Sequence, residues 1–171
     1  MQSDWEKLQA ETAEWQALVG QAVVSFGELE LITLKCLAHI PFDRVADTAA
    51  KLGFTQRVDL LVEILHGRQV SHPTIEGFVK KLLRAKELAR TRNLIAHNPV
   101  MLTVFTHMST GDVKFERLIR SARNDRHTME LAELKEFATE VSDLASEIWL
   151  SLGKIIEAAR DQQSGGSPTA V

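Results

Sequence analysis

The stretch ARTRNLIAHNP, residues 89–99, brings together three side chains that could handle a phosphodiester. His97 carries an imidazole, which titrates near neutral pH and can act as a general base or a general acid. Arg92 offers a permanent charge and a planar fork of N–H donors that matches phosphate oxygens. Asn93 lies one helical turn before His97 and could orient its ring or contact phosphate. These types suit metal-free cleavage of a phosphodiester, which needs a base for the attacking hydroxyl, an acid for the leaving oxygen and positive charge for the pentavalent phosphate.

A helix must present these three residues. Residues 73–97 carry apolar side chains at helical spacing, and the proline that begins this range suits a first turn, where its missing N–H costs nothing. Pro99 disfavours helical geometry at the residue before it, so we expect the helix to end at about His97. At about 100° per residue, Asn93 falls near the centre of the apolar stripe, His97 beside it and Arg92 at its edge. The stripe consists of Ile75, Phe78, Val79, Leu82 and Ala89.

Two interpretations of this placement remain open. A histidine on an apolar face is usually packed in the core with its hydrogen bonds satisfied, and the three polar residues would then be structural. Burying a guanidinium without a partner is costly, however. Arg92 should therefore either pair with a carboxylate or lie on a face that opens onto a cleft or a second subunit. Glu30 is a candidate carboxylate, because it lies within the apolar stripe of the first helix. It is either a solvated helix-edge glutamate or a supporting residue that holds Arg92 or Asn93 in place.

The same helix is rich in basic residues, although the whole chain has a net charge of -3. That net charge argues against a protein that coats nucleic acid by bulk charge, but a local surplus could follow an RNA backbone, with Lys86 and Arg90 as substrate-binding residues. The alternative is a solvated face that reflects the preference of helix C-termini for cations. Between positions 80 and 92 the basic residues are Lys80, Lys81, Arg84, Lys86, Arg90 and Arg92, against Glu87 alone.

Other kinds of reactive site are missing from the sequence. There is no Gly-rich phosphate loop and no nucleophile elbow. The remaining histidines show no metal-ligand spacing, so we expect no metal and no cofactor. They are His39, His66, His72, His107 and His127.

The rest of the chain reads as helices around one β-hairpin. Helical periodicity covers about residues 4–38, a short piece at 44–52, then 55–65 and 131–160. Two β-branched runs, VMLTVFTH and DVKFERLI, flank the turn-like MSTGD and predict a hairpin. The Gly/Ser/Pro-rich residues 161–171 predict a disordered tail. We therefore expect a single all-α domain over residues 1–160, an up-and-down bundle of about four main helices with a short β-hairpin inserted before the last.

Length and composition indicate the number of domains and the cellular compartment. The chain has 171 residues, of which 44% are hydrophobic and 25% charged, as expected of one globular domain. Its single cysteine, Cys36, cannot form an internal disulfide, which suits a reducing cytosol. The acidic, polar start resembles no secretory signal, and no uninterrupted apolar run approaches the ~20 residues of a membrane span. We expect a cytoplasmic protein that does not contact membranes.

The segment RNLIAH resembles the signature of the HEPN superfamily, in which four to six positions separate an arginine from a histidine and a polar residue directly follows the arginine. Arg92, Asn93 and His97 match these three positions. The order of features also matches, with FGELE in the first helix, LGFTQRVDLL in the second, the motif ending the third and an amphipathic last helix. The resemblance covers residue 15 to about residue 160.

This resemblance implies an all-α bundle that dimerises so that two copies of the motif face one cleft. It implies a metal-independent endoribonuclease, such as a toxin or antiviral effector with an antitoxin or other protein partner, or else a non-catalytic interaction module or scaffold. Some related toxins are silenced by modification of a tyrosine shortly after the motif histidine; this chain contains no tyrosine, which excludes that route. A second apolar set on the motif helix also favours a homodimer: Leu83, Leu88, Leu94 and Ile95.

Overall fold

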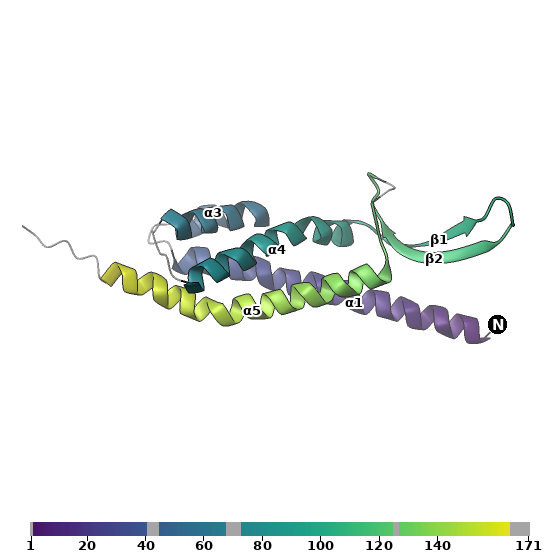
Figure 1. Cartoon of the computed structure of the whole chain (residues 1–171), viewed down its shortest axis with the longest axis horizontal. Helices are drawn as coiled ribbons and strands as arrows, with labels where there is room; N and C mark the ends of the chain where they lie inside the picture. Colours follow the sequence, from purple (N-terminus) through teal and green to yellow (C-terminus); the bar gives the residue numbers. More distant parts are fainter. Residues whose placement is uncertain (1, 41–44, 68–72, 125–126, 165–171) are drawn as a thin grey trace, which may run out of the picture. The chain divides into compact units, whose positions relative to one another are not determined.

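The computed structural model describes residues 2–40, 45–67, 73–124 and 127–164. It is mostly helical, with a small antiparallel sheet before the last helix, as the sequence predicted (Figure 1). The elements in chain order are α1 (Gln2–His39), α2 (Val45–Ala49), α3 (Phe54–Gly67), α4 (Pro73–His97), β1 (Val100–Thr106), β2 (Val113–Arg120), β3 (Thr128–Met129) and α5 (Leu131–Ser164).

The helix that carries the motif has the predicted bounds. α4 begins at Pro73 and ends at His97, because the first proline suits a helix start and Pro99 prevents the chain from continuing the helix. The predicted end of α5 was wrong: the helix runs to Ser164, so residues 161–164 are not part of a tail. Their sequence, DQQS, contains glutamines, which favour helix, and the glycines come only afterwards. Residues 165–171 lie outside the described part of the chain.

The predicted hairpin is present, and a third strand extends it. β1 and β2 pair antiparallel from Val100 opposite Ile119 to Thr106 opposite Val113. In the turn, the His107 N–H donates to the Asp112 carbonyl and the Gly111 N–H to the His107 carbonyl, both at 2.8 Å. Gly111 has a φ of 74°, a conformation that glycine adopts without strain. β3 pairs with the other side of β2, giving the order β1-β2-β3. A two-residue strand is too short for periodicity to reveal.

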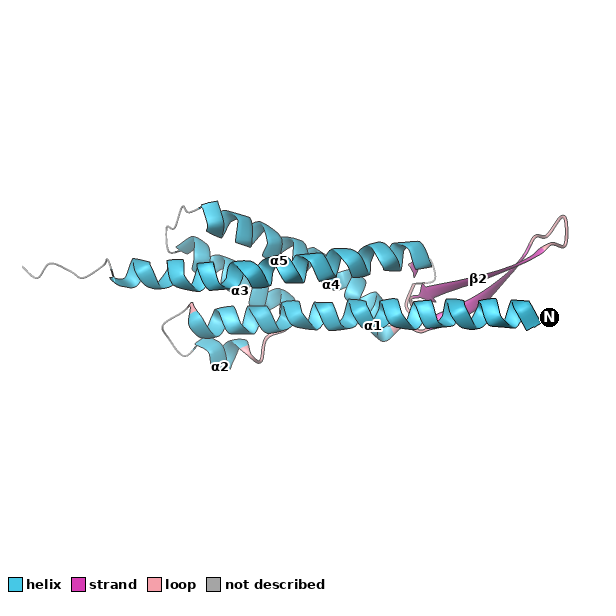
Figure 2. Cartoon of the chain, turned by 90° about the horizontal axis from the view of Figure 1, so that it is seen from below, coloured by secondary structure: helices cyan, strands magenta, loops and turns pink. Residues whose placement is uncertain are grey.

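The chain divides into two compact units. The first, which we call the motif unit, comprises Met1–Ser25 and Arg90–Ser142; the second, the helical unit, comprises Phe26–Ala89 and Asp143–Val171. α1, α4 and α5 each contribute residues to both, and Figure 2 shows α1 as one uninterrupted helix. The motif unit therefore contains the whole sheet and the end of α4 with Arg92, Asn93 and His97.

Apolar side chains from every long helix fill the interior. In the helical unit, the Phe26 and Phe54 rings meet edge to face with centroids 4.9 Å apart. In the motif unit the buried residues come from α1, α4, the sheet and α5: Trp15, Ala22, Leu94, Ile95, Leu118, Ile119, Met129, Leu134, Phe137, Ala138 and Val141. The motif unit thus has apolar packing beneath both its sheet and its helix ends.

One buried arginine ties α1 to α3 within the helical unit. Arg57 is 8% exposed; its Nε donates to the Thr33 hydroxyl at 3.3 Å and a terminal nitrogen donates to the Leu52 carbonyl at 3.0 Å. Burial lowers the pKa of the Arg57 guanidinium. In this unit Cys36 is also buried, and desolvation raises the pKa of its thiol to about 12. Both groups serve the interior rather than an exposed site.

α1 contains one stretch, Gln9–His39, that is long and apolar enough to cross a membrane by length and composition. Core helices of soluble proteins meet the same criterion. α1 supplies several of its apolar side chains to the buried interior, including Trp15, Phe26 and Leu29.

Candidate functional site

The three motif residues lie at the C-terminal end of α4, on its solvent-facing side. Asn93 and His97 are exposed and Arg92 is partly buried. The prediction that the apolar stripe continues through Asn93 was wrong, because the buried side of this last part of α4 is formed by Leu94 and Ile95. The core-histidine interpretation is contradicted for the same reason. The exposure of Asn93 and His97 agrees with an open face, and the expected carboxylate partner of Arg92 stays a prediction.

One hydrogen bond joins the side chains of two motif residues on this face. A terminal nitrogen of Arg92 donates to the amide oxygen of Asn93 at 3.1 Å. The His97 ring makes no hydrogen bond within the part of the chain that the structure describes. An exposed imidazole without an internal partner can meet a substrate proton directly, and an amide that already accepts from the guanidinium can hold that guanidinium in one orientation.

Asn98 fixes the end of α4 in the motif unit, and sequence reasoning missed it. Its side-chain nitrogen donates to the Leu94 carbonyl at 2.8 Å, and its side-chain oxygen accepts the Ala122 N–H at 2.8 Å. One amide thus satisfies a carbonyl of the last helical turn and joins it to the segment after β2. The available signal was an asparagine directly after the last helical residue, where side-chain capping is common. Because Asn98 directly follows His97, these two hydrogen bonds also hold the backbone next to the histidine in place.

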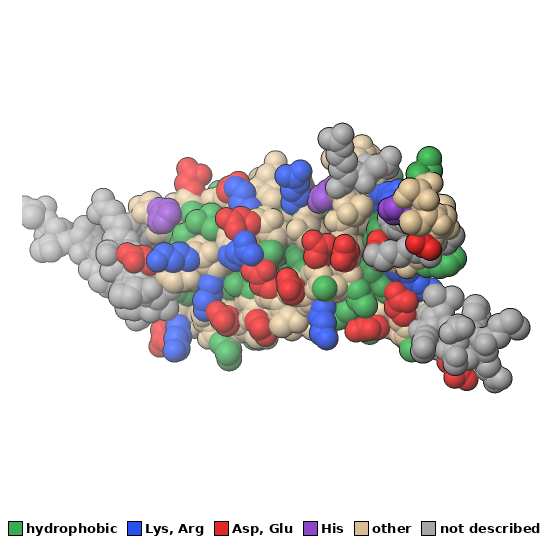
Figure 3. All heavy atoms as spheres, turned by 45° about the vertical axis from the view of Figure 1, so that its right-hand side comes forward, with side chains coloured by type: hydrophobic (Ala, Val, Ile, Leu, Met, Phe, Trp, Pro, Cys, Tyr) green, Lys and Arg blue, Asp and Glu red, His purple; other side chains and the backbone are tan. Residues whose placement is uncertain are grey.

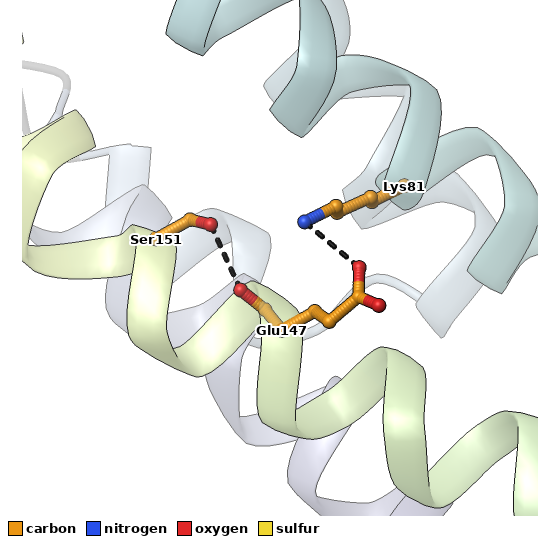
Figure 4. Close-up of polar contacts among 3 residues, drawn as sticks. All are labelled: Lys81, Glu147 and Ser151. Atoms are coloured by element: carbon orange, nitrogen blue, oxygen red, sulfur yellow. Dashed lines mark hydrogen bonds and ion pairs between the residues drawn. The ribbon is translucent and has the colours of Figure 1, made fainter.

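Within the helical unit, three basic residues of α4 have acidic partners. Lys81 reaches Glu147 of α5 at 2.9 Å, while the Ser151 hydroxyl donates to the Glu147 backbone carbonyl (Figure 4). Lys86 pairs with Asp59 of α3 at 2.5 Å. Arg84 pairs with Glu87 along the helix at 2.8 Å. Acidic and basic side chains are accordingly mixed over the face in Figure 3 instead of forming a patch of one sign.

The two predicted substrate-binding residues therefore differ. Arg90 is exposed and belongs to the motif unit, as His97 does. Lys86 belongs to the helical unit, and its ammonium already has a carboxylate partner. Ion pairs this exposed contribute about 0–1 kcal/mol, so a phosphate could compete for Lys86, but it is the weaker candidate of the two.

The motif unit has further arginines that the sequence analysis did not consider. Arg117 and Arg120 on β2, and Arg123 just after it, recur every third residue in ERLIRSAR. A terminal nitrogen of Arg117 donates to the Thr12 hydroxyl of α1. The Nε atoms of Arg117 and Arg120 are buried without a hydrogen-bond partner among the described residues. Arg123 is exposed and directly follows Ala122, whose N–H donates to the Asn98 side chain, so the backbone next to Arg123 is bonded to the residue after α4.

Glu30, the predicted supporting residue, belongs to the helical unit and is partly exposed. Its backbone carbonyl accepts the Thr33 hydroxyl at 2.8 Å. Arg92 and Asn93 belong to the motif unit, so its expected contact with them stays a prediction.

No group of three or more His, Cys, Asp or Glu residues suited to a metal occurs in the described ranges. The helical unit has a hollow of about 270 Å³, which no predicted site residue lines. Its walls are Glu28, Leu31, Ile32, Ser146 and Trp149. Comparison with protein-family models, curated proteins and solved structures finds no match for this chain.

Proposed function

We propose that this chain is a HEPN-like, metal-independent endoribonuclease, built as an up-and-down bundle of four main helices and acting as a homodimer. The observation that carries the proposal is the open face at the end of α4, where the exposed His97 ring has no hydrogen bond to any described residue and Arg92 donates to Asn93. This surface offers two of the groups that RNA cleavage needs, a base and a cation, together with an amide that can orient the cation.

The reaction follows from these groups. His97 accepts the proton of the 2′-OH as that oxygen attacks the adjacent phosphorus. Arg92 donates hydrogen bonds to the phosphoryl oxygens as negative charge grows in the pentavalent transition state. The bond to the 5′-oxygen then breaks, and that oxygen takes a proton from an imidazolium. The products are a 2′,3′-cyclic phosphate and a 5′-OH. We assign the flanking phosphates to Arg90 and Arg123. Of the two substrate-binding residues that the sequence suggested, Arg90 is the stronger candidate and Lys86 the weaker.

A second copy of the chain supplies the second histidine. One motif offers one imidazole, whereas the reaction uses a base and an acid, and a twofold axis brings two motifs to one cleft. The motif helix offers less apolar surface for a dimer contact than the sequence suggested. Leu88, Leu94 and Ile95 are buried within the chain, and Leu83 is the exposed member of that set. The proposed dimer therefore depends mainly on the polar motif face. We place the enzyme in the cytoplasm, as a toxin or antiviral effector with a protein antitoxin.

The test is cleavage of a single-stranded RNA by purified protein in EDTA. Arg92→Ala and His97→Ala should each reduce the rate roughly a hundredfold or more, and products should carry 2′,3′-cyclic phosphates. His66→Ala is the matched control, because His66 is exposed at the end of α3 in the helical unit and should leave the rate unchanged. Cleavage abolished by EDTA, or a fully active His97→Ala protein, would overturn the mechanism. Equal harmlessness of wild type and His97→Ala on induced expression would leave the scaffold function as the better account.

A further inference from the structure

Among the described residues, β1 has a backbone partner on one side only. It is the outer strand of the sheet, and β2 pairs with its inner side alone (Figure 1). Natural edge strands are usually protected by a charged residue, a proline or a bulge. β1 has none of these across its seven residues, VMLTVFT, and its pairing with β2 runs one to one without a bulge. Such an edge is a template for another strand.

The hairpin fixes which residues point outward. The His107 N–H bonds to the Asp112 carbonyl, so these two form a hydrogen-bonded pair facing each other across the ladder. In antiparallel strands such pairs alternate, which directs the backbone groups of residues 101, 103 and 105 toward β2. The N–H and C=O groups of Val100, Leu102, Val104 and Thr106 must then point away from β2. They make no hydrogen bond with any described residue.

The residues with the outward backbone groups also carry exposed apolar side chains. Leu102 is 49% exposed and Val104 is 55% exposed. Alternation places both on the same sheet face, together with exposed Phe115, which lies opposite Val104 on β2. The edge therefore combines unpaired backbone groups with apolar surface, and its occupant must be an extended strand with apolar side chains at alternate positions.

We infer that this occupant is β1 of a second copy of the chain, paired antiparallel about a twofold axis at Thr103. Full overlap of two seven-residue strands sets residue 100 opposite residue 106 of the partner strand, and residue 102 opposite residue 104. Every such pair joins two residues whose backbone N–H and C=O groups point away from β2. These groups can therefore bond to each other across the two strands without a shift of register. Leucine meets valine across the seam, and no charge is brought against a like charge, because β1 contains none.

This seam is a different contact from the proposed motif-facing dimer. In the seam the two β1 strands run in opposite directions, so the two Val100 residues, and the ends of α4 that precede them, lie roughly 20 Å apart along the strand axis. Two motifs so placed do not share a cleft. A chain with both contacts assembles beyond a dimer, and a chain with the seam alone is a dimer.

The test measures mass by light scattering at micromolar concentration. Leu102→Lys introduces a charge at the seam, and Val104→Pro removes an outward N–H that no bond inside the chain uses. Both variants should halve the mass of the wild-type particle while retaining its helical circular dichroism. Met108→Lys is the control, since Met108 is 99% exposed at the hairpin tip outside the seam, and it should retain the full mass.

A cross-link provides the second arm. Thr103 faces its own copy in a non-hydrogen-bonded pair, where Cα atoms lie about 4.5 Å apart, within disulfide range. Thr103→Cys should therefore form a covalent dimer under oxidation, while Met101→Cys should not; Cys36 is fully buried and contributes no background. Unchanged mass in both edge variants, or no cross-link at Thr103, overturns the seam. A fall from dimer to monomer supports the seam and refutes the motif-facing dimer; a fall from tetramer to dimer supports both.

Discussion

Replacing Asn98 by alanine should destabilise the end of α4, whereas the same substitution at Asn93 should not. The Asn98 amide makes two hydrogen bonds of 2.8 Å, one to the Leu94 carbonyl and one from the Ala122 N–H. A hydrogen bond contributes about 0.5–1.5 kcal/mol, and partial exposure favours the lower half, so the loss of both should cost about 1–2 kcal/mol. In a protein of this size that is a fall in Tm of about 2–8 °C.

Asn93 is the matched residue, five positions earlier on the same helix end. Its amide oxygen accepts one exposed hydrogen bond from Arg92 at 3.1 Å. Alanine has a higher helix propensity than asparagine by about 0.5 kcal/mol, which offsets that bond, so the free energy of unfolding of Asn93→Ala should equal or exceed that of wild type. Asn98→Asp adds a further comparison. It retains the acceptor for Ala122 but loses the donor to Leu94 and sets a carboxylate against the negative end of the helix.

Urea unfolding at 25 °C provides the free energies, and amide hydrogen exchange at Ala122 reports the bond itself. Asn98→Ala should exchange faster at Ala122 than wild type does, and Asn98→Asp should retain part of the protection. Equal free energies for Asn98→Ala and Asn93→Ala would refute the reasoning. So would unchanged exchange at Ala122, because the amide would then not depend on the Asn98 side chain.

Three further predictions concern the helical unit. Arg57→Ala should lower the free energy of unfolding in urea by about 2–3 kcal/mol, because it leaves the Leu52 carbonyl without its donor. Arg57→Met should lower it less, because methionine retains the aliphatic stem without a buried charge. Equal losses for the two variants would contradict this. Burial raises the pKa of Cys36 from 9.0 to about 12, so the unfolded thiol loses its proton first as pH rises. The free energy of unfolding should therefore fall by about 1.4 kcal/mol per pH unit between pH 9 and pH 12. The difference between wild type and Cys36→Ala should show this slope, and a pH-independent difference would exclude it. Lys81→Met should change the free energy of unfolding by less than about 1 kcal/mol, because the ion pair between Lys81 and Glu147 is exposed. A loss of several kcal/mol would mean that the pair is shielded from solvent.

The sequence was most informative where a local rule decides the outcome. Pro73 and Pro99 set both ends of α4 through the backbone alone, and two β-branched runs around a Gly-Asp turn predicted the hairpin. It was least informative where neighbours decide. Periodicity assigns residues to a helix face but does not say which element packs on that face. The ion pair between Lys86 and Asp59, and the bond between Asn98 and Ala122, could therefore not be predicted.

The placement of the motif illustrates the same limit. The stripe from Ile75 to Ala89, extended at constant angle, predicts a buried Asn93, but the buried side near the end of α4 is formed by Leu94 and Ile95. A helix follows whichever apolar residues its local neighbours cover, so the buried side moves around the cylinder once those neighbours change. The residue types that suggested chemistry were recognised in the sequence, but periodicity left open whether their side chains are buried or exposed.

Asn93 is the motif residue that folding physics explains least. Leu94 and Ile95 complete the buried side without it, and the preference of helix C-termini for cations accounts for Arg92 and His97 but not for an amide. Lysine or glutamate would be as soluble there and a better helix former. If Asn93 orients Arg92 for catalysis, Asn93→Ala should unfold at the same or higher urea concentration yet cleave RNA more slowly than wild type, with a smaller loss than Arg92→Ala. Stability and activity moving in opposite directions is the mark of a residue retained for function. A variant that is more stable and fully active would remove Asn93 from the site.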